Sequence, residues 1–201
     1  MDVTIVGASG GCGREIVTQI VQQRLLENRE ILQLVGSNPQ SKRPHLLHGF
    51  RADLQDAYAE IIPELNVTDD PEKIIGDVVV ITGGQTFSTN PAEIGAASRD
   101  VLARANVAVF ERFARSLAST RREYPPVVII VTNPVELGVA IFAKYLPRTH
   151  VIGMGAFPIQ PASAGRLPRI SASGGSEYTA ICWANTATAW CRSGVRSGYT
   201  A

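Results

Sequence analysis

The sequence predicts a doubly wound α/β domain over residues 1–157, in which helices cover both faces of a parallel sheet. Two observations carry this prediction. Short apolar runs alternate with longer segments of helical periodicity. The apolar runs are continuous, which is typical of parallel strands buried on both faces. Ligands of such folds bind at the carboxyl ends of the strands, so the residues that follow each strand are candidates for a site.

The predicted elements follow the apolar blocks in order. Strands are expected at DVTIVG (2–7), ILQLVG (31–36), DVVVITGG (77–84), PVVIIVTNP (126–134) and HVIGMG (150–155). Helices are expected over 12–28, within 45–62, over 98–120 and over 135–146. Apolar residues near helical spacing predict the buried faces of the first two helices: Ile16, Ile20, Val21 and Leu25, then Leu47, Phe50, Leu54 and Ala57.

The composition excludes several classes of partner. The chain has 19 Lys and Arg against 18 Asp and Glu, a net charge of +1, which gives no electrostatic attraction to nucleic acid or an anionic membrane. Its apolar runs are too short to span a membrane. The three cysteines, Cys12, Cys182 and Cys191, have no paired spacing, which favours free thiols and no structural metal. We therefore expect a soluble cytoplasmic protein.

A glycine-rich turn, GASGGCG (7–13), joins the first strand to the first helix. Gly7 allows a tight turn, Gly10 lets the backbone approach a pyrophosphate, and Gly13 allows close packing of helix on strand. The helix N-terminus offers N–H groups and the positive end of its dipole to phosphates. The turn therefore predicts a nucleotide site formed by Gly7, Ala8, Ser9, Gly10, Gly11, Cys12 and Gly13. The alternative is a tight turn that binds nothing, and Cys12 is expected to be a small packing residue.

The end of the second strand bears on the choice of cofactor. An acidic residue there usually binds the ribose hydroxyls of NAD, but this sequence has Gly36. Gly36, Ser37 and the following Ser41, Lys42 and Arg43 would tolerate a 2′-phosphate, so NADP is favoured over NAD. The alternative is a polar turn whose basic residues face water.

Several fragments together resemble the lactate/malate dehydrogenase family over residues 1–157. GASGGCG, LVGS, ADLQDA, DVVVITGG, RDVLARAN, VVIIVTNPV and HVIGMG occur in the family's order, and VTNPV followed by VIGMG is the more specific pair. The resemblance implies an NAD(P)-dependent oxidoreductase that transfers hydride between the nicotinamide and a 2-hydroxy or 2-oxo acid. It also implies a homodimer formed through helices of this domain.

The resemblance further implies roles for single residues. Arg99 matches the arginine that binds the substrate carboxylate, Asn106 an asparagine near the nicotinamide ribose, and Asn133 the one that orients substrate. Gly83 and Val131 match further cofactor-binding positions. Arg99 could instead be a solvated residue of a first helical turn, and Asn133 a turn former before a proline.

Two departures from the family matter. The loop at 83–98, where the family carries a further active-site arginine, contains no Lys or Arg, so a substrate other than malate or lactate is possible. His45, His48 and His150 are expected far from the strand ends where the chemistry would occur, so no catalytic residue is predicted. The rival interpretation is a non-catalytic nucleotide-sensing module related to atypical short-chain dehydrogenases. The catalytic form of that class needs Tyr-x-x-x-Lys, which this sequence lacks.

Residues 158–201 are rich in Gly, Ser, Thr and Ala and predict a low-order tail. We hypothesise that this tail is read in the wrong frame. Read from the third base of codon 158, PIQPASAGRLPRISASGG is compatible with DSARFRREIAADLGVRR, and CWANTATAWCRSGV (182–195) with LGEHGDGMVPLWSS. The first string would supply the family's aspartate and a substrate-binding arginine, and the second its catalytic histidine. The alternative is a genuine, divergent tail.

Overall fold

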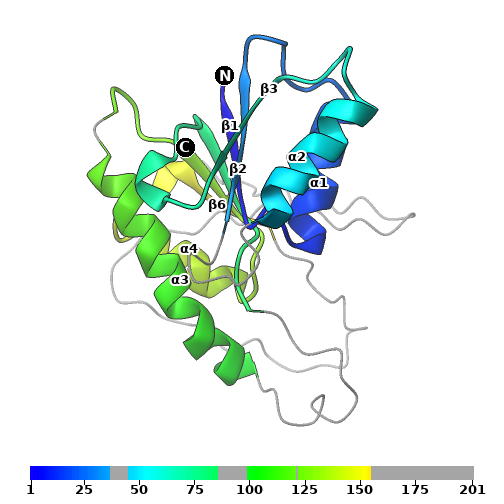
Figure 1. Ribbon diagram of the computed structural model, residues 1–201. Coiled ribbons are helices and arrows are strands. Elements are labelled where there is room, and N and C mark those ends of the chain that lie inside the picture. Colours follow the sequence, from blue (N-terminus) through cyan, green and yellow to red (C-terminus); the bar gives the residue numbers. More distant parts are fainter. Residues whose placement is uncertain (37–44, 86–98, 121, 155–201) are drawn as a thin grey trace, which may run out of the picture.

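The computed structural model describes residues 1–36, 45–85, 99–120 and 122–154 and contains one six-stranded sheet (Figure 1). The strand order is β3-β2-β1-β4-β5-β6, and every neighbouring pair is parallel. The strands are β1 (Val3–Val6), β2 (Ile31–Val35), β3 (Glu64–Thr68), β4 (Val78–Ile81), β5 (Val127–Ile130) and β6 (Val151–Gly153).

Helices cover both faces of this sheet. The helices α1 (Gly11–Gln22) and α2 (His45–Ala57) lie on one face, and α3 (Arg99–Ser119) and α4 (Val135–Phe142) on the other (Figure 1). Two short 3-10 turns, η1 (Pro71–Lys73) and η2 (Arg148–His150), complete the described elements. The doubly wound α/β prediction is confirmed.

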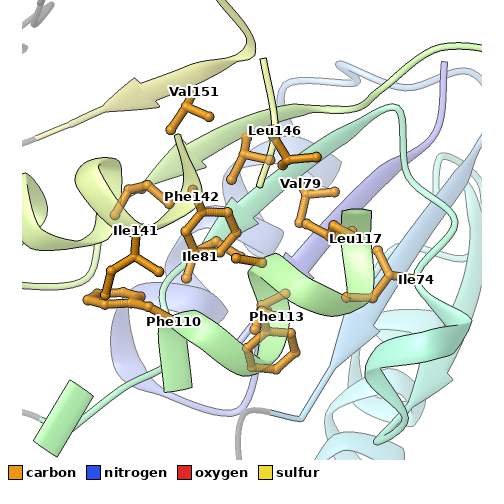
Figure 2. Close-up of a cluster of buried hydrophobic side chains, with 14 of the residues drawn as sticks. Ile74, Val79, Ile81, Phe110, Phe113, Leu117, Ile141, Phe142, Leu146 and Val151 are labelled. Atoms are coloured by element: carbon orange, nitrogen blue, oxygen red, sulfur yellow. The ribbon is translucent and has the colours of Figure 1, made fainter. Parts of the chain in front are cut away.

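Each face of the sheet has its own hydrophobic core. On the α3–α4 side, Phe110, Phe113 and Phe142 are fully buried, and the rings of Phe110 and Phe142 meet edge to face at 6.3 Å (Figure 2). On the α1–α2 side, Ile5 and Leu32 pack with apolar residues of both helices. Successive residues of one strand enter opposite cores, since Ile5 of β1 lies in the core on the α1–α2 side and Val6 in the core on the α3–α4 side.

The register brings the carboxyl ends of the strands to one edge of the sheet. Val6 pairs with Val35 and with Ile81, Val35 pairs with Thr68, and Ile81 with Ile130. We call this the carboxyl edge. The segments that follow β1, β2, β3, β4 and β5 all leave the sheet there.

The structure corrects several predicted elements. β3 has no counterpart in the sequence prediction, because it is a half-exposed edge strand without an apolar run. Helix α1 ends at Gln22 rather than at residue 28, and Arg24 has a positive φ of 52°. Leu25 is therefore 59% exposed and not buried. In the helix, Val17 is buried together with Val21, while Ile16 and Ile20 are half-buried. In α2, the face is as predicted except for the exposed Ala57.

The predicted domain limit at residue 157 and the tail at 158–201 lie outside the described residues. Among the helices that the structure describes, none has the length and apolar character needed to cross a membrane.

Candidate functional site

The glycine turn packs against the centre of the carboxyl edge. Gly7 has a φ of +83°, and a Cβ at this position would lie 2.5 Å from both Cα and N of Gly83, in the segment after β4. The turn is tied to β2 because the amides of Gly7 and Ala8 both donate to the Val35 carbonyl, at 2.8 and 3.3 Å. Only glycine satisfies both the backbone conformation and the close approach at residue 7.

Gly13 lets helix α1 sit directly on this turn. A Cβ at Gly13 would collide with the Gly7 carbonyl oxygen and lie 2.8 Å from Cα of Ala8. A Cβ at Gly10 would meet only the Gly7 carbonyl oxygen, at 3.3 Å, and a Cβ at Gly11 would have no neighbour within 4 Å. The spacing of glycines therefore has a steric reason at Gly7 and Gly13, while Gly10 and Gly11 keep a path to the backbone open.

The N-terminus of α1 is open to a ligand. Gly10 is the N-cap, no side chain caps the helix, and the first turn contains no acidic residue. The first amide hydrogen bond inside the helix runs from Arg14 N to Gly10 O, at 2.9 Å. The preceding amides of the first turn are thus left to an acceptor from outside the helix, as an anion would provide. Cys12 lies exposed in this turn, so the expectation that it packs is wrong.

A buried asparagine fixes the neighbouring loops. Asn106 on α3 is fully buried, and its Nδ2 donates to the carbonyls of Gln85 and Asn133, at 3.0 and 2.8 Å. Its Oδ1 accepts from the Gln85 amide at 2.7 Å. Asn106 therefore joins the segment after β4 to the segment after β5. The side chain itself is enclosed, so it holds these loops in place from inside.

Thr132 strengthens the same junction and was missed by sequence reasoning. Its hydroxyl is buried within reach of the carbonyls of Ile81 and Gly83, at 3.1 and 3.0 Å. The following residue, Asn133, has an exposed side chain and uses only its backbone carbonyl for Asn106. Val131 is half-buried and its amide donates to Ile81. The Asn133 side chain is thus exposed at the carboxyl edge.

Other predicted site residues lie partly or wholly outside the described part of the chain. Arg99 is the first residue of α3, and its side chain is outside the described residues. Ser37 and most of the 83–98 loop, from residue 86 on, also lie outside them.

The histidines do not gather at this site. His150 lies at the opposite edge of the sheet, where its Nδ1 is 2.9 Å from the Pro125 carbonyl oxygen. His45 and His48 are exposed on α2. The start of α2 lies close to the end of β2, since Leu47 contacts the Gly36 position. His45 and His48 therefore lie near the end of β2, but not near the ends of β4 or β5, where the chemistry would occur.

A carboxylate stands at the end of β2, although the residue that follows β2 is a glycine. A Cβ on Gly36 would collide with Oδ1 of Asp69 and lie 3.4 Å from its Cγ. Asp69 follows β3, and its neighbour Thr68 pairs with Val35. The preference for NADP that Gly36 predicts takes no account of this carboxylate. The sequence held no signal for it, because the β2–β3 register alone brings the two residues together.

Comparison with known proteins identifies the family and supports the fold. A family model described as lactate/malate dehydrogenase, NAD binding domain, matches residues 1–153. Malate dehydrogenase from Plasmodium falciparum is similar in fold, with 22% sequence identity and a TM-score of 0.62 over 77% of this chain and 45% of that one. Lactate dehydrogenase from Eimeria maxima, solved with NADH and oxamate, shares 20% identity with a TM-score of 0.61, over 77% and 43% of the two chains.

The lactate dehydrogenase from Cryptosporidium parvum, complexed with lactic acid and nicotinamide adenine dinucleotide, shares 21% identity with a TM-score of 0.60. The match covers 76% of this chain and 44% of that one. The chain thus spans less than half the length of these proteins. At such identities the likeness establishes the fold.

Proposed function

Because this chain belongs to the lactate/malate dehydrogenase family through its nucleotide-binding domain, we propose that it binds a nicotinamide adenine dinucleotide at the Gly7–Gly13 turn. The observation that carries the proposal is the uncapped N-terminus of α1, held against the centre of the carboxyl edge by Gly7 and Gly13. Free amides and the helix dipole would both stabilise a pyrophosphate there.

The rest of the carboxyl edge fits an elongated ligand. Gly7 contacts the Gly83 segment, so the turn at β1 leads directly to the junction that Asn106 and Thr132 hold after β4 and β5. The nicotinamide would lie at this junction and the adenosine on the β2 side. When bound, the cofactor would accept or release a hydride.

The chain's own residues would hold the second substrate, a 2-hydroxy or 2-oxo acid. Arg99, at the start of α3, would bind the carboxylate, and the exposed Asn133 amide would orient the group at C2. Oxidation of the alcohol also requires a base to take its proton. In the part of the chain that the structure describes, no histidine stands beside Asn133 in a position to do so. We therefore expect this chain to bind cofactor and to turn over almost no substrate.

Titration tests the binding proposal. The full chain is titrated with NADH and NADPH, and then with oxamate, pyruvate and oxaloacetate in the presence of the tighter nucleotide, following fluorescence and thermal stability. We expect nucleotide binding, and further stabilisation by a 2-oxo acid. A response to nucleotide alone would favour the sensor-type alternative, and no response to either nucleotide would refute the proposal.

The coding DNA tests the reading-frame hypothesis for residues 158–201, which lie outside the described part of the chain. The gene is sequenced around codon 158, and one base is inserted before that codon. If the hypothesis holds, the product gains the missing histidine and oxidises a 2-hydroxy acid, as the formation of the reduced nicotinamide would report. Codons that do not give the two expected peptides in the shifted frame would refute it.

A further inference from the structure

The end of β2 is where a dinucleotide-binding domain of this fold usually presents an acidic residue to the adenosine ribose. Here the backbone of β2 continues into Gly36, whose amide donates to the Thr68 carbonyl at 3.1 Å. This bond keeps β2 and β3 in register up to the carboxyl edge, so the residue after Thr68 stands beside Gly36. That residue is Asp69, and its carboxylate lies in the space that a side chain on Gly36 would fill.

The Asp69 carboxylate has no polar partner among the residues that the structure describes. The residue is exposed, and among the described residues nothing donates a hydrogen bond to its carboxylate or forms an ion pair with it. It differs in this respect from its neighbour Asp70, which accepts from the Glu72 amide at 3.0 Å and caps η1. Asp70 has a structural role, whereas the described structure gives Asp69 none.

Asp69 also lies on the β2 side of the glycine turn, where the adenosine of a bound dinucleotide is expected. Both amides at the start of that turn, of Gly7 and Ala8, donate to Val35, the residue just before Gly36. Neighbouring strands are about 4.8 Å apart, so a carboxylate that reaches from β3 over β2 stands about one strand from the turn. A nucleotide whose phosphates occupy the turn would place its adenosine ribose over β2.

We infer that the Asp69 carboxylate accepts hydrogen bonds from the adenosine ribose hydroxyls and makes the chain prefer NAD(H) over NADP(H). The inference rests on the proposed nucleotide binding. A carboxylate accepts from two neighbouring hydroxyls but repels a phosphate placed on one of them. Gly36 is then the consequence of this arrangement, since any side chain at residue 36 would collide with the carboxylate.

The test compares the affinities of the full chain for NADH, NADPH and the 2′-deoxy form of NADH. We expect the unmodified chain to bind NADH at least about tenfold more tightly than NADPH, which is the effect of one charge-assisted hydrogen bond. Asp69→Asn should weaken NADH binding by about tenfold and leave NADPH binding equal or tighter. Loss of the 2′-hydroxyl should weaken binding to the unmodified chain, but should have little further effect on Asp69→Asn.

Matched variants separate this role from an effect on folding. Asp56→Asn removes another exposed carboxylate, from the last turn of α2, and should leave the NADH/NADPH ratio unchanged. The double variant Asp69→Gly with Gly36→Asp returns the carboxylate to β2 and should restore the preference for NADH. An unchanged ratio in Asp69→Asn, with both nucleotides still bound, would overturn the inference alone. Failure of the unmodified chain to bind any nucleotide would instead overturn the proposed function.

Discussion

The two halves of the sheet prepare the carboxyl edge in different ways. In the β1–β3 half, the edge around the glycine turn is made of backbone, with glycines at residues 7, 10, 11 and 13 and an uncapped helix. In the β4–β6 half, the edge is fixed by buried side chains, the Asn106 amide and the Thr132 hydroxyl, which bind loop carbonyls. Both halves contribute to both cores, since Val35 and Ile130 lie in the core on the α3–α4 face and Leu32 and Val80 in the core on the α1–α2 face. The difference therefore concerns the site and not the stability of its support.

The contrast has a physical reason. A pyrophosphate is recognised by amides that point in one direction, and side chains would only obstruct them. A loop that presents a side chain such as Asn133 needs a fixed backbone. The buried Asn106 amide fixes it rigidly, because its own hydrogen bonds are satisfied. Added side-chain atoms should therefore do most harm in the β1–β3 half, and removed side-chain atoms in the β4–β6 half.

The largest effect is expected from adding atoms at Gly13. Gly13→Val would drive a side chain into the Gly7 carbonyl, so we expect about 3 kcal/mol of lost stability and no NADH binding. Urea unfolding and fluorescence titration measure the two effects. Gly11→Ala is the control, because a Cβ there meets nothing within 4 Å. It should change the free energy of unfolding by less than about 1 kcal/mol. Equal losses in both variants would contradict the steric account.

Removing the Asn106 side chain should have the next largest effect. Asn106→Ala leaves the Gln85 amide, the Gln85 carbonyl and the Asn133 carbonyl without their partner, which should cost about 2 kcal/mol in urea unfolding. Asn133→Ala is the matched change at an exposed position and should cost less than about 0.5 kcal/mol, while weakening oxamate binding. If the two variants were equally stable, the junction would not depend on the buried amide.

The smallest effect is expected at the opposite edge of the β1–β3 half, where the Met1 amino group donates to Glu30 Oε1 at 2.6 Å. This hydrogen bond raises the pKa of the amino group above 8.0 and lowers the pKa of Glu30 below 4.5. The carboxylate's contribution is lost as the pH falls through its lowered pKa, and the amine's as the pH rises through its raised pKa.

Glu30→Gln should therefore lower the melting temperature slightly, with the full difference between about pH 4.5 and pH 8.0. The difference should fade as the pH falls through the lowered pKa of Glu30 or rises through the raised pKa of the amino group. Parallel thermal scans of both proteins across the pH range measure it. A difference that persists at pH 2 would mean that the ion pair is not its cause.

Sequence reasoning succeeded where one element is enough to define a feature. The buried strands, the glycine turn and the apolar face of α2 each follow from a local pattern. Sequence reasoning failed where a feature depends on contacts with segments that are distant in the sequence. β3 (ELNVT) has too few apolar residues to be identified, and it is a strand because β2 offers it an edge. Asp69 meets Gly36 only through that pairing, and the enclosure of Asn106 depends on loops from two other strands.

The central position of β1 also governs the order in which this domain can form during synthesis. Val3 pairs with Leu32 on one side and with Val78 on the other, so β1 is completed only after the chain has been made past β4. Parallel pairings between distant segments close large loops and form slowly. On the ribosome, the first strand to emerge thus waits half-covered until β4 follows it. A nascent chain stopped before residue 78 would expose one side of β1 and should require protection from aggregation.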